Sequence, residues 1–262
     1  MMGLEEQAYA DLVRTTMGNV NPTPPVVPVQ LVVYTHSYTA FIGGASDKYS
    51  FAPNDLPINI GGRGLGPNRF VGEYFDEFDL SQKKKFKNAT IEYYGYEEAY
   101  TGMKAGGKKL DAFDNIKKFL EKNPNTQVNI IGHSLGGWNA AGLAAELGKK
   151  KICKVNLLIT IDPVGTLLSY SALTPVSARI YFREPSPNCN YWVSVTCEPK
   201  SYDSNDAVAD SGGQWRDKPK ERANVFYSTK YSHAEFKEMM KEKIFMGQSA
   251  EDMMFTQLKK IK

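Results

Sequence analysis

The 262-residue sequence lacks any apolar run of about 18 residues, the length that a membrane-spanning helix needs. It also lacks an excess of one charge, because 32 Lys and Arg face 29 Asp and Glu and leave +3, too little for a nucleic-acid groove. With 42% apolar and 23% charged residues the chain does not have the composition of a disordered protein. We therefore expect a soluble globular protein that does not bind nucleic acid.

Cysteine is scarce, with three residues in the chain, too few for a disulfide framework. Cys189 and Cys197 flank a β-like run at residues 190–196 and could bridge a hairpin in an oxidising compartment. Three reduced thiols are the simpler interpretation.

The first 21 residues lack the pattern of a secretory signal. Glu5 and Glu6 stand where such a signal carries positive charge, and no apolar central run follows. We expect no classical export signal, and therefore either a cytoplasmic location in the producing cell or export by a leaderless route.

Apolar runs alternate with helical patterns along the chain. Strands are predicted at residues 30–35, 89–94, 128–132, 155–161, 178–183 and 223–228. Helices are predicted at residues 110–120, at residues 136–147 with a cap at Gly148, and over two C-terminal stripes, Phe236, Met240 and Ile244, then Met253, Met254, Leu258 and Ile261. Such alternation predicts an α/β fold with a mostly parallel sheet flanked by helices.

The length suits one domain, which we expect to span residues 1–262. Residues 41–88 and 185–221 show weak periodicity and are interpreted as insertions over the core. The first insertion combines glycines with apolar side chains, as a lid over an active site would, although a rigid decoration is the alternative. Its lysines favour peripheral contact with an anionic membrane surface: Lys83, Lys84, Lys85 and Lys87.

The most informative segment is residues 132–137, which read Gly-His-Ser-Leu-Gly-Gly between a predicted strand and an alanine-rich helix. A strand-to-helix turn this tight needs glycine at positions 132 and 136, because a side chain there would strike a neighbouring element. The turn would expose the Ser134 hydroxyl at a helix N-terminus, where free amides stabilise an oxyanion. We predict that Ser134 is a nucleophile; an ordinary glycine-rich turn is the alternative.

This segment resembles the nucleophile elbow of α/β-hydrolase fold lipases, which commonly has the same six residues. The resemblance is to a superfamily, strongest over residues 30–37 and 127–165 and weaker around His233. It implies an α/β-hydrolase-like fold with loop insertions, an ester or lipid substrate and no required cofactor. The chain looks most similar to small bacterial lipase-like proteins. These include esterases, phospholipases and effectors delivered by type VI secretion, for which a delivery or immunity partner is implied.

A serine hydroxyl needs an imidazole base within hydrogen-bonding reach, and the chain has three histidines. His133 adjoins the serine and is interpreted as a packing residue beneath the turn. His36 comes too early for the Ser, acid, His order of this fold. His233 remains, in a Ser-His-Ala-Glu segment whose capping box places it in the first turn of a helix.

The third residue must be a carboxylate that ends a strand between Ser134 and His233. Asp162 follows the strand at 155–161 in an Asp-Pro pair that resembles the pattern of pancreatic lipase, and its short side chain loses little entropy. Glu184, which follows the next predicted strand, is the alternative acid. We expect no metal site, and interpret three further carboxylates as solvated loop residues: Asp203, Asp206 and Asp210.

An oxyanion hole needs two backbone donors. The Leu135 amide, directly after the nucleophile, is predicted as the first. The second maps to Tyr38 by resemblance to a lipase pattern in which a His-Gly pair precedes the donor, although Ser37 stands here in place of the glycine.

These residues together predict a serine hydrolase that cleaves carboxylic esters, a lipase or phospholipase, through Ser134, His233 and Asp162 and an acyl-enzyme intermediate. Two alternatives stay open. One is a non-catalytic binding or scaffold protein on the same fold, and the other is a thioesterase, acyltransferase or peptidase that uses the same three residues.

Overall fold

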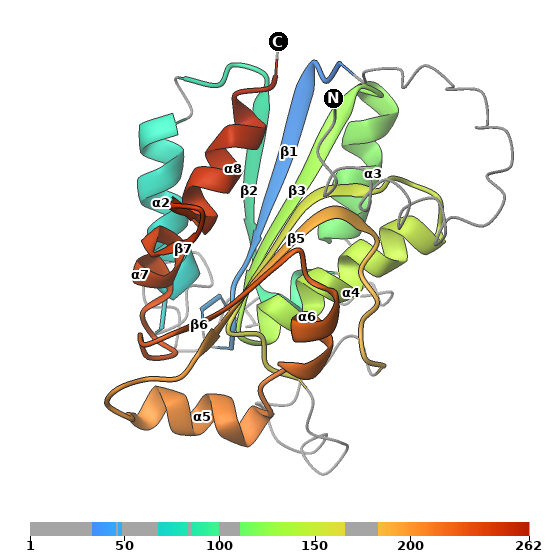
Figure 1. Cartoon of the computed structure of the whole chain (residues 1–262). Helices are drawn as coiled ribbons and strands as arrows, with labels where there is room; N and C mark the ends of the chain where they lie inside the picture. The colour runs from blue at the N-terminus through green and yellow to red at the C-terminus, as the bar shows by residue number, and fades with distance from the viewer. Residues whose placement is uncertain are drawn as a thin grey trace, which may run out of the picture. The chain divides into compact units, whose positions relative to one another are not determined.

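A six-stranded sheet forms the centre of the protein (Figure 1). The computed structural model describes residues 33–45, 47–48, 68–82, 85–99, 111–165 and 183–261, and residues Val33–Lys262 form one compact unit. The strand order is β2-β1-β3-β4-β5-β6, and every neighbouring pair is parallel. The strands are β1 (His36–Ile42), β2 (Ala89–Tyr94), β3 (Thr126–His133), β4 (Val155–Ile161), β5 (Cys189–Cys197) and β6 (Val225–Thr229).

Helices cover both faces of this sheet (Figure 1). One face carries α3 (Ala112–Lys122), α4 (Leu135–Lys149) and α6 (Asp217–Arg222), and the other carries α2 (Phe70–Gln82), α7 (Phe236–Lys241) and α8 (Ala250–Leu258). At the carboxyl ends of the strands lies α5 (Ser204–Gly212), and η1 (Tyr96–Glu98) follows β2. A parallel sheet between two helical layers confirms the predicted α/β-hydrolase-like fold class.

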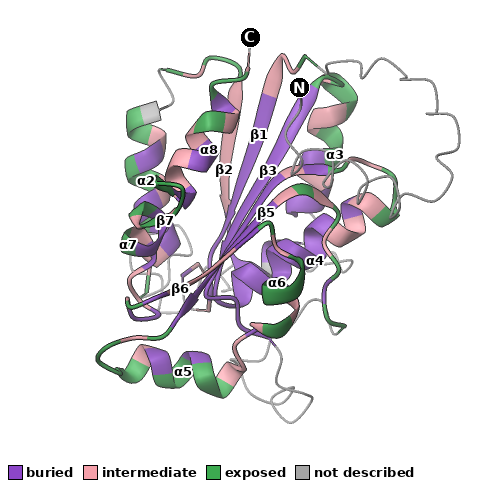
Figure 2. Ribbon diagram, viewed as in Figure 1, coloured by how far each residue is buried: buried purple, intermediate pink, exposed green. Residues whose placement is uncertain are grey.

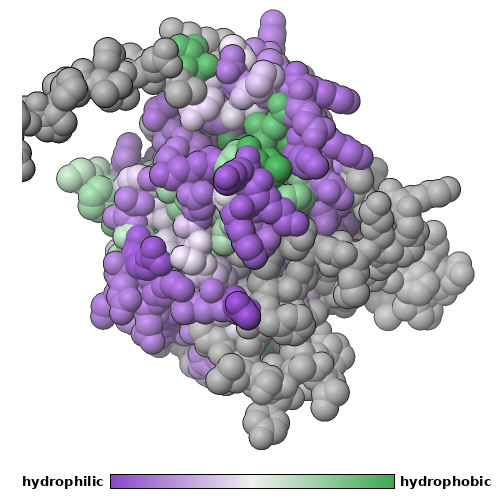
Figure 3. Space-filling view, turned by 90° about the vertical axis from the view of Figure 1, so that its right-hand side faces the viewer, coloured by the Kyte–Doolittle hydropathy of each residue, from purple (hydrophilic) through white to green (hydrophobic). Residues whose placement is uncertain are grey.

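Each face of the sheet has its own hydrophobic core, and successive residues of β4 alternate between the two. Leu158 packs with the α3 and α4 side, whereas Leu157 and Ile159 pack with the α2, α7 and α8 side. Figure 2 shows the central strands buried along most of their length. Burial on both faces explains the unbroken apolar runs of the sequence. On the side drawn in Figure 3 the described surface is largely hydrophilic, with a small hydrophobic group near its centre.

Local patterns placed several elements correctly. The strands predicted at 89–94 and 155–161 are β2 and β4 with the same bounds, and both C-terminal helices are present as α7 and α8. A short hairpin that was not predicted, β7 (Lys243–Phe245) with β8 (Gln248–Ser249), joins those two helices. The predicted cap at Gly148 is wrong, because α4 continues to Lys149. Gly148 instead makes room for a neighbour, since a Cβ there would lie 2.1 Å from Nδ2 of Asn188.

The first strand lies later in the chain than predicted. We expected it at residues 30–35, but 30–32 lie outside the described residues, 33–35 are not in a strand, and β1 begins at His36. Its position is set by pairing on both sides, with Ser37 to Ile42 in register with Ala89 to Tyr94 on β2 and Gln127 to Gly132 on β3. Partners distant in sequence decided the register.

The expected insertion at 185–221 contains a sheet strand, which corrects that interpretation. β5 lies between β4 and β6 and is parallel to both, so residues 190–196 are not part of a hairpin. Cys189 and Cys197 are free thiols at opposite ends of this strand, roughly 26 Å apart at 3.3 Å per residue, and no bridge can join them. The strand predicted at 178–183 falls outside the described residues except for Arg183, which is not in a strand.

The expected insertion at 41–88 also takes part in the core. Phe41 and Ile42 belong to β1, and α2 buries Val71, Tyr74 and Phe78 against the sheet. Residues 49–67, where the lid glycines lie, are outside the described residues. Among the helices that the structure describes, none combines the length and apolar character required to cross a membrane.

Candidate active site

The strand order marks one position at the carboxyl edge of the sheet. From β1 the chain goes to β2 on one side and then to β3 on the other, so its direction across the sheet reverses between β1 and β3. Loops that leave such a reversal diverge and open a crevice, where ligands bind in open α/β sheets. Residues 43–45 follow β1 at this point and Ser134 follows β3.

Ser134 has the backbone geometry of a nucleophile elbow. Its φ of 57° and ψ of −130° lie outside the regions that side chains ordinarily adopt. The two glycines are required as predicted: a Cβ at Gly132 would lie 2.3 Å from the Gly136 carbonyl oxygen, and one at Gly136 would lie 2.3 Å from that of Ile42. The Ser134 amide donates to the carbonyl of Ile161 at 3.1 Å, which fixes the turn against the end of β4.

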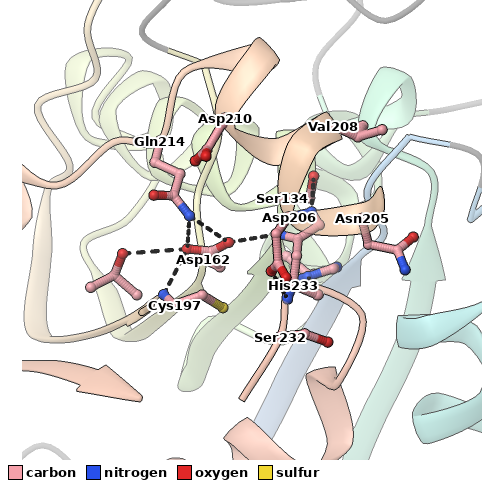
Figure 4. A network of polar contacts seen from close by, with 12 residues as sticks. Ser134, Asp162, Cys197, Asn205, Asp206, Val208, Asp210, Gln214, Ser232 and His233 are labelled. Atoms are coloured by element: carbon pink, nitrogen blue, oxygen red, sulfur yellow. Dashed lines mark hydrogen bonds and ion pairs between the residues drawn. The ribbon is translucent and has the colours of Figure 1, made fainter. Parts of the chain in front are cut away.

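Three side chains chosen from the sequence meet in one hydrogen-bonded chain (Figure 4). The Ser134 hydroxyl donates to Nε2 of His233 at 3.0 Å, and Nδ1–H of His233 donates to Oδ2 of Asp162 at 2.6 Å. The residues come from the ends of β3 and β4 and from the turn after β6. All three are buried, with 8%, 5% and 0% of Ser134, His233 and Asp162 exposed. This is the geometry that activates a serine nucleophile.

The Asp162 carboxylate is held by donors on both of its oxygens. Oδ1 accepts from the Cys197 amide at 2.9 Å, from the Thr196 hydroxyl at 3.3 Å and from the Gln214 side chain at 3.1 Å, and Gln214 also reaches Oδ2 at 3.2 Å. Burial alone would raise the pKa of Asp162, but its bonds with His233 and the Cys197 amide outweigh burial and lower the pKa to about 2. Asp162 is therefore ionised at neutral pH.

Arg216 orients one of these donors from the next layer out. Its Nε–H donates to the Thr196 hydroxyl oxygen at 3.0 Å, so the hydroxyl proton is left to point at Asp162. A second guanidinium nitrogen donates to the Cys197 carbonyl at 2.5 Å. Sequence reasoning missed Gln214 and Arg216, because nothing in the sequence around them indicates that this segment returns to the end of β4.

His233 lies in a turn and not in the first turn of a helix, which corrects the predicted placement. The helix that follows, α7, begins at Phe236 with Glu235 as its cap. The Glu235 carboxylate accepts from the Ser232 amide at 2.7 Å, so the side-chain contact expected of the pair forms one turn before the helix. The turn places the imidazole over the end of β3.

Glu184, the alternative acid, lies elsewhere. It accepts from the Trp215 indole at 2.8 Å and from Lys218 at 3.2 Å, and half of its side chain is exposed. It makes no described contact with His233. Asp162 is the carboxylate that orients the imidazole.

Leu135 is the first residue of α4, where backbone amides have no acceptor within the helix, so its N–H is available beside Ser134. Tyr38 is not, and that assignment is corrected: it lies within β1, paired on both sides with Thr90 and Val128, and its hydroxyl bonds that of Tyr94 at 2.5 Å. The lipase-like pattern was aligned with a loop that is in fact strand. The backbone that reaches the nucleophile is Gly44, where a Cβ would lie 2.8 Å from Ser134 Cβ.

The other histidines and acidic residues have structural surroundings. His133 ends β3, buried as predicted, with its ring packed against Phe70 and Phe236. His36 begins β1 at the opposite edge of the sheet. The interpretation of three aspartates as solvated loop residues is wrong in part: Asp203 caps α5 and Asp206 is buried, whereas Asp210 is exposed and bonds Tyr202. Among the described residues no group of acidic, histidine or cysteine side chains is arranged to hold a metal.

No protein-family model and no curated protein matches this sequence. Solved structures similar to it include an esterase of Pyrobaculum calidifontis, 14% identical with a TM-score of 0.41, covering 76% of this chain and 67% of that one. The RedJ thioesterase of prodiginine biosynthesis in Streptomyces coelicolor is 11% identical with a TM-score of 0.38, covering 100% and 97%. EstE1, a carboxylesterase cloned from a metagenomic library, is 14% identical with a TM-score of 0.35, covering 76% and 70%. Function therefore has to be argued from the site.

Proposed function

We propose that this protein is a serine hydrolase that cleaves carboxylic esters through Ser134, His233 and Asp162. The observation that carries the proposal is the continuous hydrogen-bonded chain from Asp162 Oδ2 through His233 to the Ser134 hydroxyl, at 2.6 and 3.0 Å. A scaffold would have no need to keep a strained serine, a buried imidazole and a buried carboxylate in this order. Strain and burial of polar groups are costs that catalysis explains.

The reaction follows from these contacts. Ser134 Oγ attacks the ester carbonyl carbon while its proton passes to Nε2 of His233, and the carbonyl oxygen becomes an oxyanion that accepts from the Leu135 amide and from an amide of the loop at 43–45. Nε2–H then protonates the departing alcohol as the C–O bond breaks and the acyl-enzyme forms. Water, deprotonated by His233, releases the acid and restores Ser134. Ionised Asp162 stabilises the imidazolium in both steps.

A lipid ester is the proposed substrate class. Beside the predicted oxyanion donor lies a buried apolar cluster made by Tyr96, Leu135, Val164 and Ala209, with Ala45 packed against it. An acyl chain whose carbonyl reaches Ser134 would contact this cluster and lose apolar surface to water. Two apolar side chains near the same edge of the sheet stay exposed, Val208 on α5 and Tyr202 before it, at 50% and 61%, and would favour contact with a membrane surface.

A panel of p-nitrophenyl esters of increasing chain length, together with phospholipid vesicles and an acyl thioester, tests the proposal. We expect ester hydrolysis that rises with chain length in the wild type and is lost in Ser134→Ala. Cleavage of the thioester alone would favour a thioesterase. Equal and negligible rates for both proteins on every substrate would favour a scaffold.

A further inference from the structure

We propose that His133 and Asp206 are positioning residues that hold the backbone of His233 from both sides. The site described above fixes the side chain of His233, but its backbone lies in a turn between β6 and α7. Residues in such a turn have no ladder or helix partners, so their N–H and C=O groups need other ones. Both partners here are side chains from distant elements. The catalytic meaning of this arrangement rests on the proposed function.

Asp206 takes the amide side. Its Oδ1 accepts from the His233 N–H at 2.8 Å, and its Oδ2 accepts from the Asp203 N–H at 2.9 Å (Figure 4). Asp206 is 2% exposed, which is unusual for a carboxylate that caps a surface helix. The same carboxylate thus completes the capping box of α5 and anchors the turn that carries His233.

His133 takes the carbonyl side. Its Nε2–H donates to the His233 carbonyl oxygen at 2.9 Å, and the two imidazole rings lie 4.6 Å apart at 33°. Because His133 directly precedes Ser134 in the chain, this bond links the base to the nucleophile through one peptide unit. A shift of the turn would therefore have to break a buried hydrogen bond before the distance from His233 to Ser134 could change.

His133 is suited to act as a permanent donor because it stays neutral. Burial, and next the neighbouring imidazole of His233, lower the pKa of His133 to about 3. Its Nδ1 is buried and finds no hydrogen-bond partner in the described part of the chain, so a second proton would be unsatisfied. The tautomer with Nε2–H is therefore fixed at the pH where His233 works.

Variants that keep or lose each contact test this proposal. His133→Gln places an amide N–H near the former Nε2, whereas His133→Asn is equally polar but too short to reach the carbonyl. Asp206→Asn keeps one oxygen for the His233 amide, whereas Asp206→Ala keeps none. Controls are Asp210→Ala, an exposed carboxylate on the same helix, and His36→Asn, a histidine at the other edge of the sheet.

Two readouts are needed, ester turnover and the NMR signal of the His233 Nδ1 proton, identified by its loss in His233→Ala. We expect His133→Asn and Asp206→Ala to lower kcat about 10- to 100-fold with KM within about twofold, because misplacing a catalytic group by an ångström costs rates of that size. Exchange of the Nδ1 proton with water should be accelerated at least about tenfold. His133→Gln and Asp206→Asn should recover most of both, and the controls should match the wild type.

Wild-type kcat and proton exchange in folded His133→Asn and Asp206→Ala would overturn the proposal, as would equal losses in the long and short variants of each pair. If a short variant does not fold, the pair at the other position decides. The proton measurement needs no turnover. A wild type that cleaves no ester but loses its protected proton in His133→Asn would remove the proposed function and leave the positioning role standing.

Discussion

Asp162 lies 2.6 Å from Nδ1 of His233 and is completely buried, yet it is the acidic member of a site that must hold a charge. The donors around it, with the imidazole first, keep its pKa near 2 in spite of that burial. An ionised carboxylate at this position fixes the tautomer of His233 and stabilises the imidazolium that forms when Ser134 loses its proton.

Asp162→Asn should therefore lower kcat by about 10³- to 10⁴-fold while the protein stays folded, because the amide would favour the wrong imidazole tautomer. Glu184→Gln is the matched control, since Glu184 contacts Trp215 and Lys218 instead of the site. Steady-state kinetics on one p-nitrophenyl ester measure both. Full activity in Asp162→Asn with loss in Glu184→Gln would reverse the assignment of the acid.

Gly44→Val should reduce kcat/KM by at least about 100-fold, because even a Cβ at position 44 would lie 2.8 Å from Ser134 Cβ and 3.3 Å from its Oγ. The loop would have to move away from the position where an oxyanion donor is needed. Kinetics together with a melting curve check this. A folded Gly44→Val protein with the wild-type rate would show that the loop at 43–45 has no part in the site.

His133 should make the protein less stable in acid. Its pKa of about 3 in the folded state lies below the ordinary 6.5, so the unfolded chain binds the extra proton first. Its contribution is complete above pH 6.5 and is lost as the pH falls toward 3, at up to about 1.4 kcal/mol per pH unit. The difference in unfolding free energy between wild type and His133→Gln, measured across this range, should follow that slope. A difference independent of pH would contradict it.

Asp47 should act in the opposite sense. Burial raises its pKa to about 6 from 3.8, although it accepts from the amides of Val71 and Gly72 at the start of α2 and from the Tyr93 hydroxyl. The folded state therefore holds the proton longer, and stability falls as the pH rises from about 4 to 6. Asp47→Asn lacks this titration. Its unfolding free energy relative to wild type should rise over that interval by about 3 kcal/mol, and a flat difference would exclude the effect.

The nucleophile turn could be predicted because its cause is local. Gly132 and Gly136 are demanded by atoms that the same short segment and its neighbouring strand bring together, and the strand and helix around Ser134 have clear periodicity. Asp162 and His233 could be named from chain order and from strand ends. Their distances could not, since these depend on how three loops meet.

What failed depended on non-local pairing. The first strand was predicted six residues too early, and this error alone moved the expected oxyanion donor to Tyr38, inside the strand. Residues 190–196 looked like a hairpin because their partners on β4 and β6 lie about 30 residues away on either side. Asp206 and Gln214 were missed for the same reason, because contact with His233 and Asp162 appears only when their segment folds back over the carboxyl ends of the strands.

Trapping of the acyl-enzyme tests the central claim most directly. Intact-protein mass spectrometry after rapid mixing with an activated p-nitrophenyl ester, followed by peptide mapping, should show one acyl group on Ser134 that forms with a stoichiometric burst of p-nitrophenol. The group should be absent from Ser134→Ala and should form at least about 10⁴-fold more slowly in His233→Ala. Acylation of another residue, or hydrolysis that persists undiminished in Ser134→Ala, would contradict the account.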